Sequence, residues 1–261
     1  MQHESFRQLI DTMESSDPPY DYKEEIREIE KKKEAFSVKE TKAFLLTEHI
    51  RTMVYAQLSN NRKWQPIAEN MEYIDRVFGN FDPEYIKHAE ASVFVESLLK
   101  RRCGNRQIRK QMEHLKSNVE TLERIERDHG SIDAYYGNHP LVTVIKSLSE
   151  PYGRYKLKCM GVPLVCEYLK GLGLEVVKPD TLLCRLLGRL GYTNSPMEPA
   201  SHWEAIEICK DIGRVYGLSQ TMVDTVLWQY CAKDKFEVCT AKPKCESCKV
   251  LRCQYREMKD K

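Results

Sequence analysis

The sequence lacks the features that place a protein in a membrane or on a secretory route. No run of about eighteen apolar residues, the length needed for a transmembrane helix, occurs in the 261 residues. The first residues also lack the basic and then apolar pattern of a signal peptide. We therefore expect a soluble, cytoplasmic protein without a membrane partner.

Strong net charge is also lacking. The formal net charge of +2 is too small to establish a nucleic-acid partner, because such partners usually make a whole domain distinctly basic. Any such argument must rest on local clusters. One basic cluster consists of Lys100, Arg101, Arg102, Arg106, Arg109 and Lys110, and a second consists of Lys242, Lys244, Lys249 and Arg252. The first is interpreted as a solvated helix face.

Strand patterns are scarce, whereas apolar residues recur at helical spacing through most of the chain. The predicted fold class is therefore all-α. Ser201 and Glu204 form a capping box that predicts a helix start, and a further helix is expected from about Ser219 to Ala232. Asp180 is the expected N-cap of a leucine-rich helix. No solenoid-type repeat and no low-complexity linker interrupts this pattern.

Ten cysteines are present, and four of them follow one another closely near the end of the chain. Cys239, Cys245, Cys248 and Cys253 are separated by five, two and four residues. Four thiolates at such short spacings can hold one [4Fe-4S] cluster. Zinc is the competitor, but structural zinc sites usually pair two Cys-x-x-Cys motifs and only one is present here. We predict an iron-sulfur cluster, with zinc as the alternative.

A glycine-containing turn precedes an apolar helix expected from about Pro163 to Leu172. Its residues are Met160, Gly161, Val162 and Pro163. Glycine permits a tight turn, and proline suits the first turn of a helix. The unpaired amides of such a helix start can bind a DNA phosphate. Turns of this kind are common between helices, however, so the pattern alone does not distinguish a binding hairpin from a connector.

The order of these elements, a helical bundle, a hairpin, an aspartate and a cysteine loop, resembles the helix-hairpin-helix DNA glycosylases of the endonuclease III and MutY branch. The resemblance covers residues 42–255. The family's Leu-Pro-Gly-Val-Gly hairpin corresponds to 159–163, its Val-Asp-Thr-His segment to 179–182, and its Arg-Lys-Pro-Arg-Cys loop to 241–245. Ala56-Gln57 corresponds to a pair whose glutamine fills the gap left by a flipped base.

This resemblance implies a fold of two domains. A helical barrel domain would span residues 42–178, and a cluster domain would span 179–261 with the N-terminal segment 1–41 packed on it. The active site is expected in the cleft between the two domains. The family members act on double-stranded DNA that contains a damaged or mismatched base, which implies a monomeric, nucleoid-associated repair enzyme.

The resemblance also implies residue roles. Asp180 would act in catalysis beside the sugar, and Gln57 would fill the vacancy in the duplex. The residues implied to bind DNA are Gln57, Met160, Gly161, Val162, Pro163, Lys242 and Lys244, and the implied cluster ligands are Cys239, Cys245, Cys248 and Cys253.

Departures from the family pattern refine the predicted activity. Both outer cysteine gaps are one residue shorter than the family's six and five, and Pro163 replaces the second hairpin glycine. The lysine of bifunctional members is replaced by Val165, or by Val162 in an ungapped alignment, which predicts base release without strand cleavage. Thr52 stands near the adenine-specific glutamate of MutY, so adenine specificity is disfavoured. The base removed is not predicted.

Two rival functions remain open at this point. The first is a non-catalytic protein that binds DNA through the same hairpin and cluster. The second is an iron-sulfur or zinc protein whose helices bind a protein partner. Salt dependence separates the second rival from DNA binding, because contacts to phosphates are strongly salt-dependent.

Overall fold

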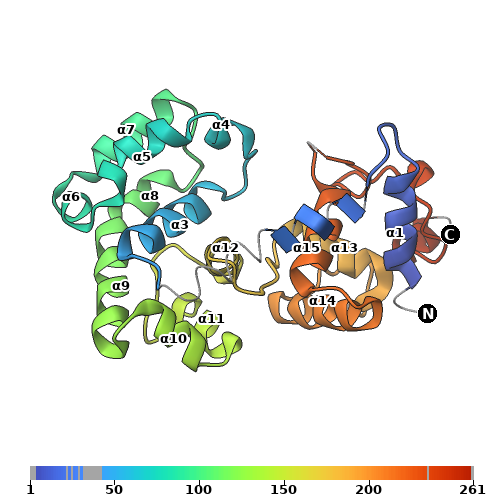
Figure 1. Ribbon diagram of the computed structural model, residues 1–261. Coiled ribbons are helices and arrows are strands. Elements are labelled where there is room, and N and C mark those ends of the chain that lie inside the picture. The colour runs from blue at the N-terminus through green and yellow to red at the C-terminus, as the bar shows by residue number, and fades with distance from the viewer. Residues whose placement is uncertain are drawn as a thin grey trace. The chain divides into compact units, whose positions relative to one another are not determined.

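The computed structural model describes residues 4–21, 23–24, 26–28, 30–31, 43–233 and 235–259 (Figure 1). These residues form helices joined by turns and contain no strand, so the predicted all-α class is confirmed for them. Two compact units are present, and we call residues 36–172 the hairpin unit and residues 1–35 with 173–261 the cysteine unit. The sequence analysis placed the boundary between the barrel domain and the cluster domain at 178/179. Its other boundary, at 41/42, lies outside the described residues.

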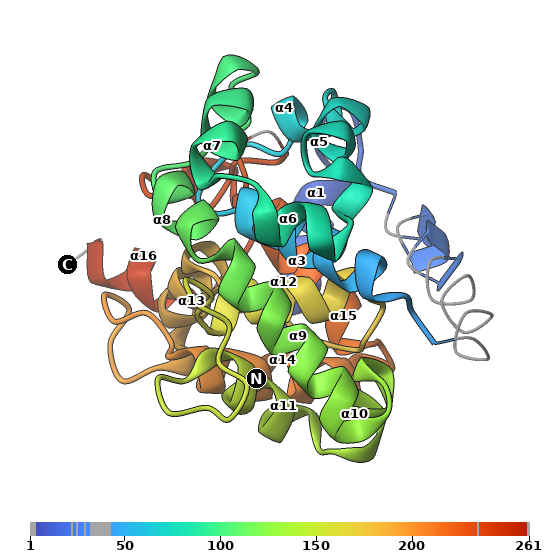
Figure 2. The same cartoon turned by 90° about the vertical axis from the view of Figure 1, so that its left-hand side faces the viewer.

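The hairpin unit consists of short helices in succession. They are α3 (Leu46–Leu58), α4 (Gln65–Ala68), α5 (Met71–Val77), the 3₁₀ turn η1 (Gly79–Phe81), α6 (Pro83–His88), α7 (Ala91–Lys100), α8 (Ile108–Glu113), α9 (Leu115–His129), α10 (Ile132–Asn138), α11 (Leu141–Ser149) and α12 (Val162–Gly171). In Figure 2, the long helix α9 (green) runs between α8 and α10.

Helix α3 forms the core of the hairpin unit. It packs against α12 and α9. Ile50, Val54 and Leu58 recur every four residues and have no exposed surface. Each fully buried side chain of this size contributes about 1.5–3 kcal/mol of transfer free energy. This packing fixes the position of α12, the helix that follows the predicted hairpin.

The cysteine unit is built around a buried helix, α15. Its helices are α1 (Glu4–Glu14), α13 (Thr181–Leu187), the π-helical turn η2 (Gly188–Tyr192), α14 (His202–Tyr216), α15 (Gln220–Cys231), the 3₁₀ turn η3 (Cys245–Ser247) and α16 (Gln254–Lys259). Helix α15 packs against α13, α14 and α1. The N-terminal helix α1 therefore belongs to the same unit as the four predicted metal ligands.

Local signals in the sequence mark the helix ends of this unit. Ser201 Oγ accepts a hydrogen bond from the Glu204 amide at 3.3 Å, and Glu204 Oε2 accepts one from the Ser201 amide at 2.8 Å. The predicted capping box is thereby confirmed. Helix α14 ends at Gly217, whose φ of 66° lies in the left-handed region that glycine adopts without strain. Ser219 caps α15, as expected from the sequence.

Candidate functional site

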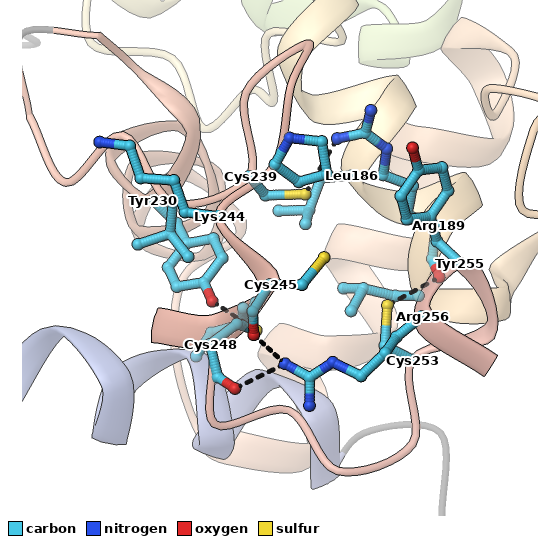
Figure 3. A pocket seen from close by; sticks show the side chains of 14 residues that line it. Leu186, Arg189, Tyr230, Cys239, Lys244, Cys245, Cys248, Cys253, Tyr255 and Arg256 are labelled. Carbon is cyan, nitrogen blue, oxygen red and sulfur yellow. Dashed lines mark hydrogen bonds between the residues drawn. The ribbon is translucent and has the colours of Figure 1, made fainter. Parts of the chain in front are cut away.

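The four predicted metal ligands converge on one cavity in the cysteine unit. Cys239 follows α15, Cys245 and Cys248 flank η3, and Cys253 directly precedes α16. All four line one cavity that is partly open to solvent (Figure 3). The fold therefore brings the four predicted ligands to one cavity, and their role as metal ligands stays a prediction.

Hydrogen bonds hold the loop that carries these cysteines. The Tyr230 hydroxyl donates to Cys248 Sγ at 2.8 Å, and Arg189 Nη1 donates to Cys239 Sγ at 3.3 Å. Arg256 Nη2 donates to the Cys248 carbonyl at 2.8 Å and also to the Cys245 carbonyl. Two of the four sulfurs thus accept hydrogen bonds from other side chains.

Helix α1 braces the same loop from the other end of the chain. Thr12 Oγ1 accepts a hydrogen bond from the Lys249 amide at 3.0 Å, and Gln8 Oε1 accepts one from the Leu251 amide at 3.0 Å. Leu9 stands between these two residues in the sequence. It has no exposed surface and lines the cavity. The N-terminal helix therefore contributes directly to the conformation of the cysteine loop.

The thiols of the cavity differ in their protonation. The pKa of Cys239 is lowered, first because the Cys231 thiol donates a hydrogen bond to its sulfur and then because Arg189 and Arg185 lie nearby. Burial raises the pKa of Cys253. The thiol of Cys239 is therefore more readily ionised for metal binding than that of Cys253, which must release a proton when it binds a metal.

The described thiols do not gather around a single point. Among the described residues, no three His, Cys, Asp or Glu side chains lie close enough together to hold one metal ion. A zinc ion requires all four sulfurs at about 2.3 Å from one point. Four sulfurs spread around a cavity suit the four irons of a [4Fe-4S] cluster, each of which takes one thiolate.

A buried cation beside the cavity favours an anionic occupant. Arg185 Nε and Nη2 are buried and have no hydrogen-bond partner within the described residues. The charge of Arg185 lowers the pKa of both Cys231 and Cys239, which places it near these sulfurs. An unpaired buried charge costs several kcal/mol unless an opposite charge lies close by. Thiolates bound to a metal cluster supply such a charge.

Asp180 caps α13, as its sequence position indicated. Its Oδ1 accepts hydrogen bonds from the amides of Leu182 at 2.9 Å and Leu183 at 3.1 Å. Its Oδ2 makes no hydrogen bond to the described residues. Burial of the carboxyl, followed by the negative charge of Asp224, raises the pKa of Asp180. One oxygen therefore holds the helix while the other is available to a ligand.

The predicted hairpin is part of a longer connection than the sequence suggested. Helix α11 ends at Ser149 and α12 begins at Val162, so residues 150–161 separate the two helices. Gly161 is the N-cap of α12, and the amides of Gly161 and Val162 donate no hydrogen bond within the described residues. With Pro163 in the first turn of α12, the helix start has the form that the sequence predicted.

Two predicted DNA-binding residues are placed where DNA does not reach their side chains. Met160 has no exposed surface, and its amide donates to the Leu157 carbonyl at 3.3 Å. Gln57 also has no exposed surface, and neither polar atom of its side chain has a partner. Their burial does not support a side-chain contact with DNA, because a side chain inside the α-helical core cannot contact a duplex unless the core opens.

The two lysines of the cysteine loop are exposed. Lys242 makes no ion pair within the described residues, whereas Lys244 Nζ lies 3.1 Å from Glu237 Oε2. An exposed ion pair of this kind contributes at most about 1 kcal/mol, so it leaves Lys244 able to exchange its partner. Both positions remain compatible with the predicted phosphate contacts.

No protein-family model, curated protein or solved structure matches this chain. Among its described residues, no helix is both long and apolar enough to cross a membrane.

Several residues that shape the site were missed by the sequence analysis. Arg185 and Arg189 lie one helical turn apart in a leucine-rich segment; Arg189 lines the cysteine cavity, and the charge of Arg185 acts on Cys239. Charged residues inside an otherwise apolar helix are expected only near a compensating charge, which was the available signal. Asn118 was also missed, because its partner Lys158 lies far along the chain and no local pattern connects them.

Asn118 holds the hairpin connection in place. Its Nδ2 donates to the Lys158 carbonyl at 3.0 Å, and its Oδ1 accepts from the Lys158 amide at 2.6 Å. We expect Asn118→Ala to lower the free energy of unfolding by about 1–3 kcal/mol, because two backbone groups lose their partners. Urea denaturation measures this loss. Asn138→Ala, at an exposed position in α10, is the control, and an equal loss in both variants would contradict the assigned role.

Proposed function

We propose that the protein is a monofunctional DNA glycosylase that carries a [4Fe-4S] cluster on Cys239, Cys245, Cys248 and Cys253. The observation that carries this proposal is the placement of α13. This helix has the carboxylate of Asp180 at its start, and the turn η2 that follows it brings Arg189 to the cysteine cavity. A candidate catalytic group and a candidate metal centre thus share one short rigid element.

The cluster has a structural role in this proposal. When bound, it cross-links the loop 239–253 through four Fe–S bonds and neutralises the cations beside the cavity. Tyr230 and Arg189 orient the thiolates by hydrogen bonding to their sulfurs. Arg256 fixes the backbone around η3, so that the exposed Lys242 meets phosphate from a defined position.

The helix start at Gly161 and Val162 supplies phosphate contacts in the hairpin unit. Its free amides point out of α12, and the positive end of the helix dipole favours an anion there. Such contacts fix the register of the protein on DNA but do not read its sequence. Selection of a base must therefore come from the cost of flipping it, which is lowest for damaged or mismatched bases.

Asp180 acts at the sugar once the base has left the stack. As the bond between C1′ and the base breaks, the bonding electrons leave with the base and positive charge develops on the sugar. The free Oδ2 of Asp180 stabilises this charge and accepts a proton from the water that attacks C1′, while the departing base takes up a proton from solvent. The products are a free base and an abasic site.

Base release from defined duplexes tests this function. We expect the purified protein to release at least one of 8-oxoguanine, uracil, thymine glycol or an alkylated purine, and to leave abasic sites that break only after alkali treatment. Strand cleavage without alkali would contradict the monofunctional assignment, since Val162 and Val165 cannot form a Schiff base. Release of none of these bases would contradict the enzymatic function.

One observation favours a second candidate, a DNA-binding protein that has lost excision. Gln57, the residue expected to fill a gap in the duplex, is buried within the hairpin unit. A protein that does not flip bases needs no such residue. This candidate keeps the cluster and the phosphate contacts, so it predicts tight duplex binding together with no release of any base from the same panel.

A further inference from the structure

The connection between α11 and α12 lies against α8. Cys159 Sγ donates a hydrogen bond to the Lys110 carbonyl at 3.7 Å. The charges of Lys110 and Lys158 both act to lower the pKa of the Cys159 thiol, against the larger opposing effect of burial. Because Asn118 of α9 holds the backbone of Lys158, this residue cannot move away from α9 without breaking two hydrogen bonds.

Four cations of this region form a group that we call the basic face. They are Arg106, Arg109, Lys110 and Lys158, all of which are exposed. None of them makes an ion pair within the described part of the chain. Glu113 is the only acidic residue between positions 100 and 116. Positive charge is therefore concentrated here without an internal partner.

Two neighbouring basic residues are already engaged and do not belong to the basic face. Arg154 Nη2 lies 3.3 Å from Asp128 Oδ2, and its side chain stacks on Tyr155. Lys156 Nζ donates to the Ser149 carbonyl at 2.7 Å, and burial lowers its pKa. The contrast is informative, because Arg154 and Lys156 are neutralised or hydrogen-bonded, whereas the cations of the basic face make no ion pair within the described residues.

We propose that the basic face is a second phosphate-binding surface for double-stranded DNA, beside the helix start at Gly161. This inference rests on the proposed function for the identity of its partner. Like charges held close together repel one another, and an anionic polymer removes that cost by replacing its own counterions. The free amides at Gly161 and Val162 favour DNA over an acidic protein, because they bind phosphate oxygens. The basic cluster 100–110 is thus more than a solvated helix face.

The salt dependence of duplex binding tests this surface. Each phosphate contact contributes about 0.9 to the slope of log K against log salt concentration, so we expect Arg109→Gln/Lys110→Gln to reduce the slope by about 1.8. The probe is an undamaged duplex, titrated at several salt concentrations by fluorescence anisotropy. The control is Lys63→Gln/Arg76→Gln, which removes the same charge from exposed positions on other elements of the hairpin unit and should leave the slope unchanged.

The outcomes separate this inference from the proposed function. An unchanged slope in Arg109→Gln/Lys110→Gln, an equal loss in the control, or no duplex binding by the unaltered protein would overturn the basic face as a DNA-binding surface. Base release by the unaltered protein together with an unchanged slope would overturn the surface alone. The expected slope change without release of any base would support the surface and contradict the enzyme.

Discussion

Asp180→Asn is expected to reduce base release by at least about 100-fold while leaving duplex binding unchanged. The asparagine oxygen still accepts the amides of Leu182 and Leu183, and Asn is as good an N-cap as Asp. The variant therefore keeps α13 and loses only the negative charge and the proton acceptor at Oδ2. Single-turnover release with saturating protein measures the effect without a contribution from binding.

A matched cap substitution separates catalysis from helix capping. Ser219 caps α15 through a hydrogen bond from the Met222 amide at 3.1 Å, and Ser219→Asn preserves that role. We expect it to release bases at the normal rate. Normal release by Asp180→Asn would show that the carboxylate serves only the fold. Equal losses in both variants would mean that cap geometry, and not charge, limits the reaction.

The pH dependence of release provides an independent reading of the same group. The reaction needs ionised Asp180, and burial raises the pKa of this carboxyl in the folded protein. Release should therefore fall as pH drops through a value above about 3.9, the ordinary pKa of aspartate. The raised pKa also has a cost for the stability of the fold. A carboxyl whose pKa is raised on folding stabilises the folded protein at low pH, and this stabilisation is lost as the pH rises through that pKa. Such a cost is typical of functional groups.

Helix ends were predictable where the signal is local. The capping box at Ser201, the cap at Ser219 and the cap at Asp180 each depend on contacts within three residues along the chain. The four cysteines were predictable for a similar reason, since a short loop cannot separate them widely. In each case the chemistry of a few neighbouring residues determines the structure.

Burial and long-range contacts were not predictable from the same patterns. Gln57 lies on a helix whose polar residues are expected at the surface, yet α3 is covered on nearly all sides. The length of the connection 150–161 depends on hydrogen bonds from Tyr155 and Leu157 back to α11 at 3.2 Å and 2.9 Å. Gly153 permits this approach, because a Cβ there would lie 2.2 Å from the Ser147 carbonyl oxygen.

The arginines near the cysteine cavity show why their role was not recognised from the sequence. Arg189 is 6% exposed although it carries a charge, and it donates to the Ala241 carbonyl at 3.2 Å as well as to Cys239. A sequence of alternating leucines and arginines resembles an ordinary amphipathic helix. Only the position of the cysteine loop shows that Arg189 faces inward, where it donates a hydrogen bond to the sulfur of Cys239.

Removal of one cysteine is expected to remove the metal. In Cys248→Ser, we expect the iron content of the purified protein to fall from about four atoms per chain to well below one, with loss of the visible absorption of the cluster. Serine keeps an acceptor for the Tyr230 hydroxyl, so the variant isolates the loss of a thiolate ligand. The cysteine unit should also unfold at a lower temperature, since the loop loses its cross-link.

A buried cysteine away from the cavity is the control for this experiment. Cys209 in α14 has no exposed surface and does not line the cavity, so Cys209→Ala should keep its iron. One zinc ion per unaltered chain and no iron would contradict the cluster but keep the four-thiolate site. Full iron content in Cys248→Ser would contradict the ligand set itself. Four metal-bound thiolates, around iron or around zinc, would offset the charge of Arg185, whose buried Nε and Nη2 have no hydrogen-bond partner within the described residues.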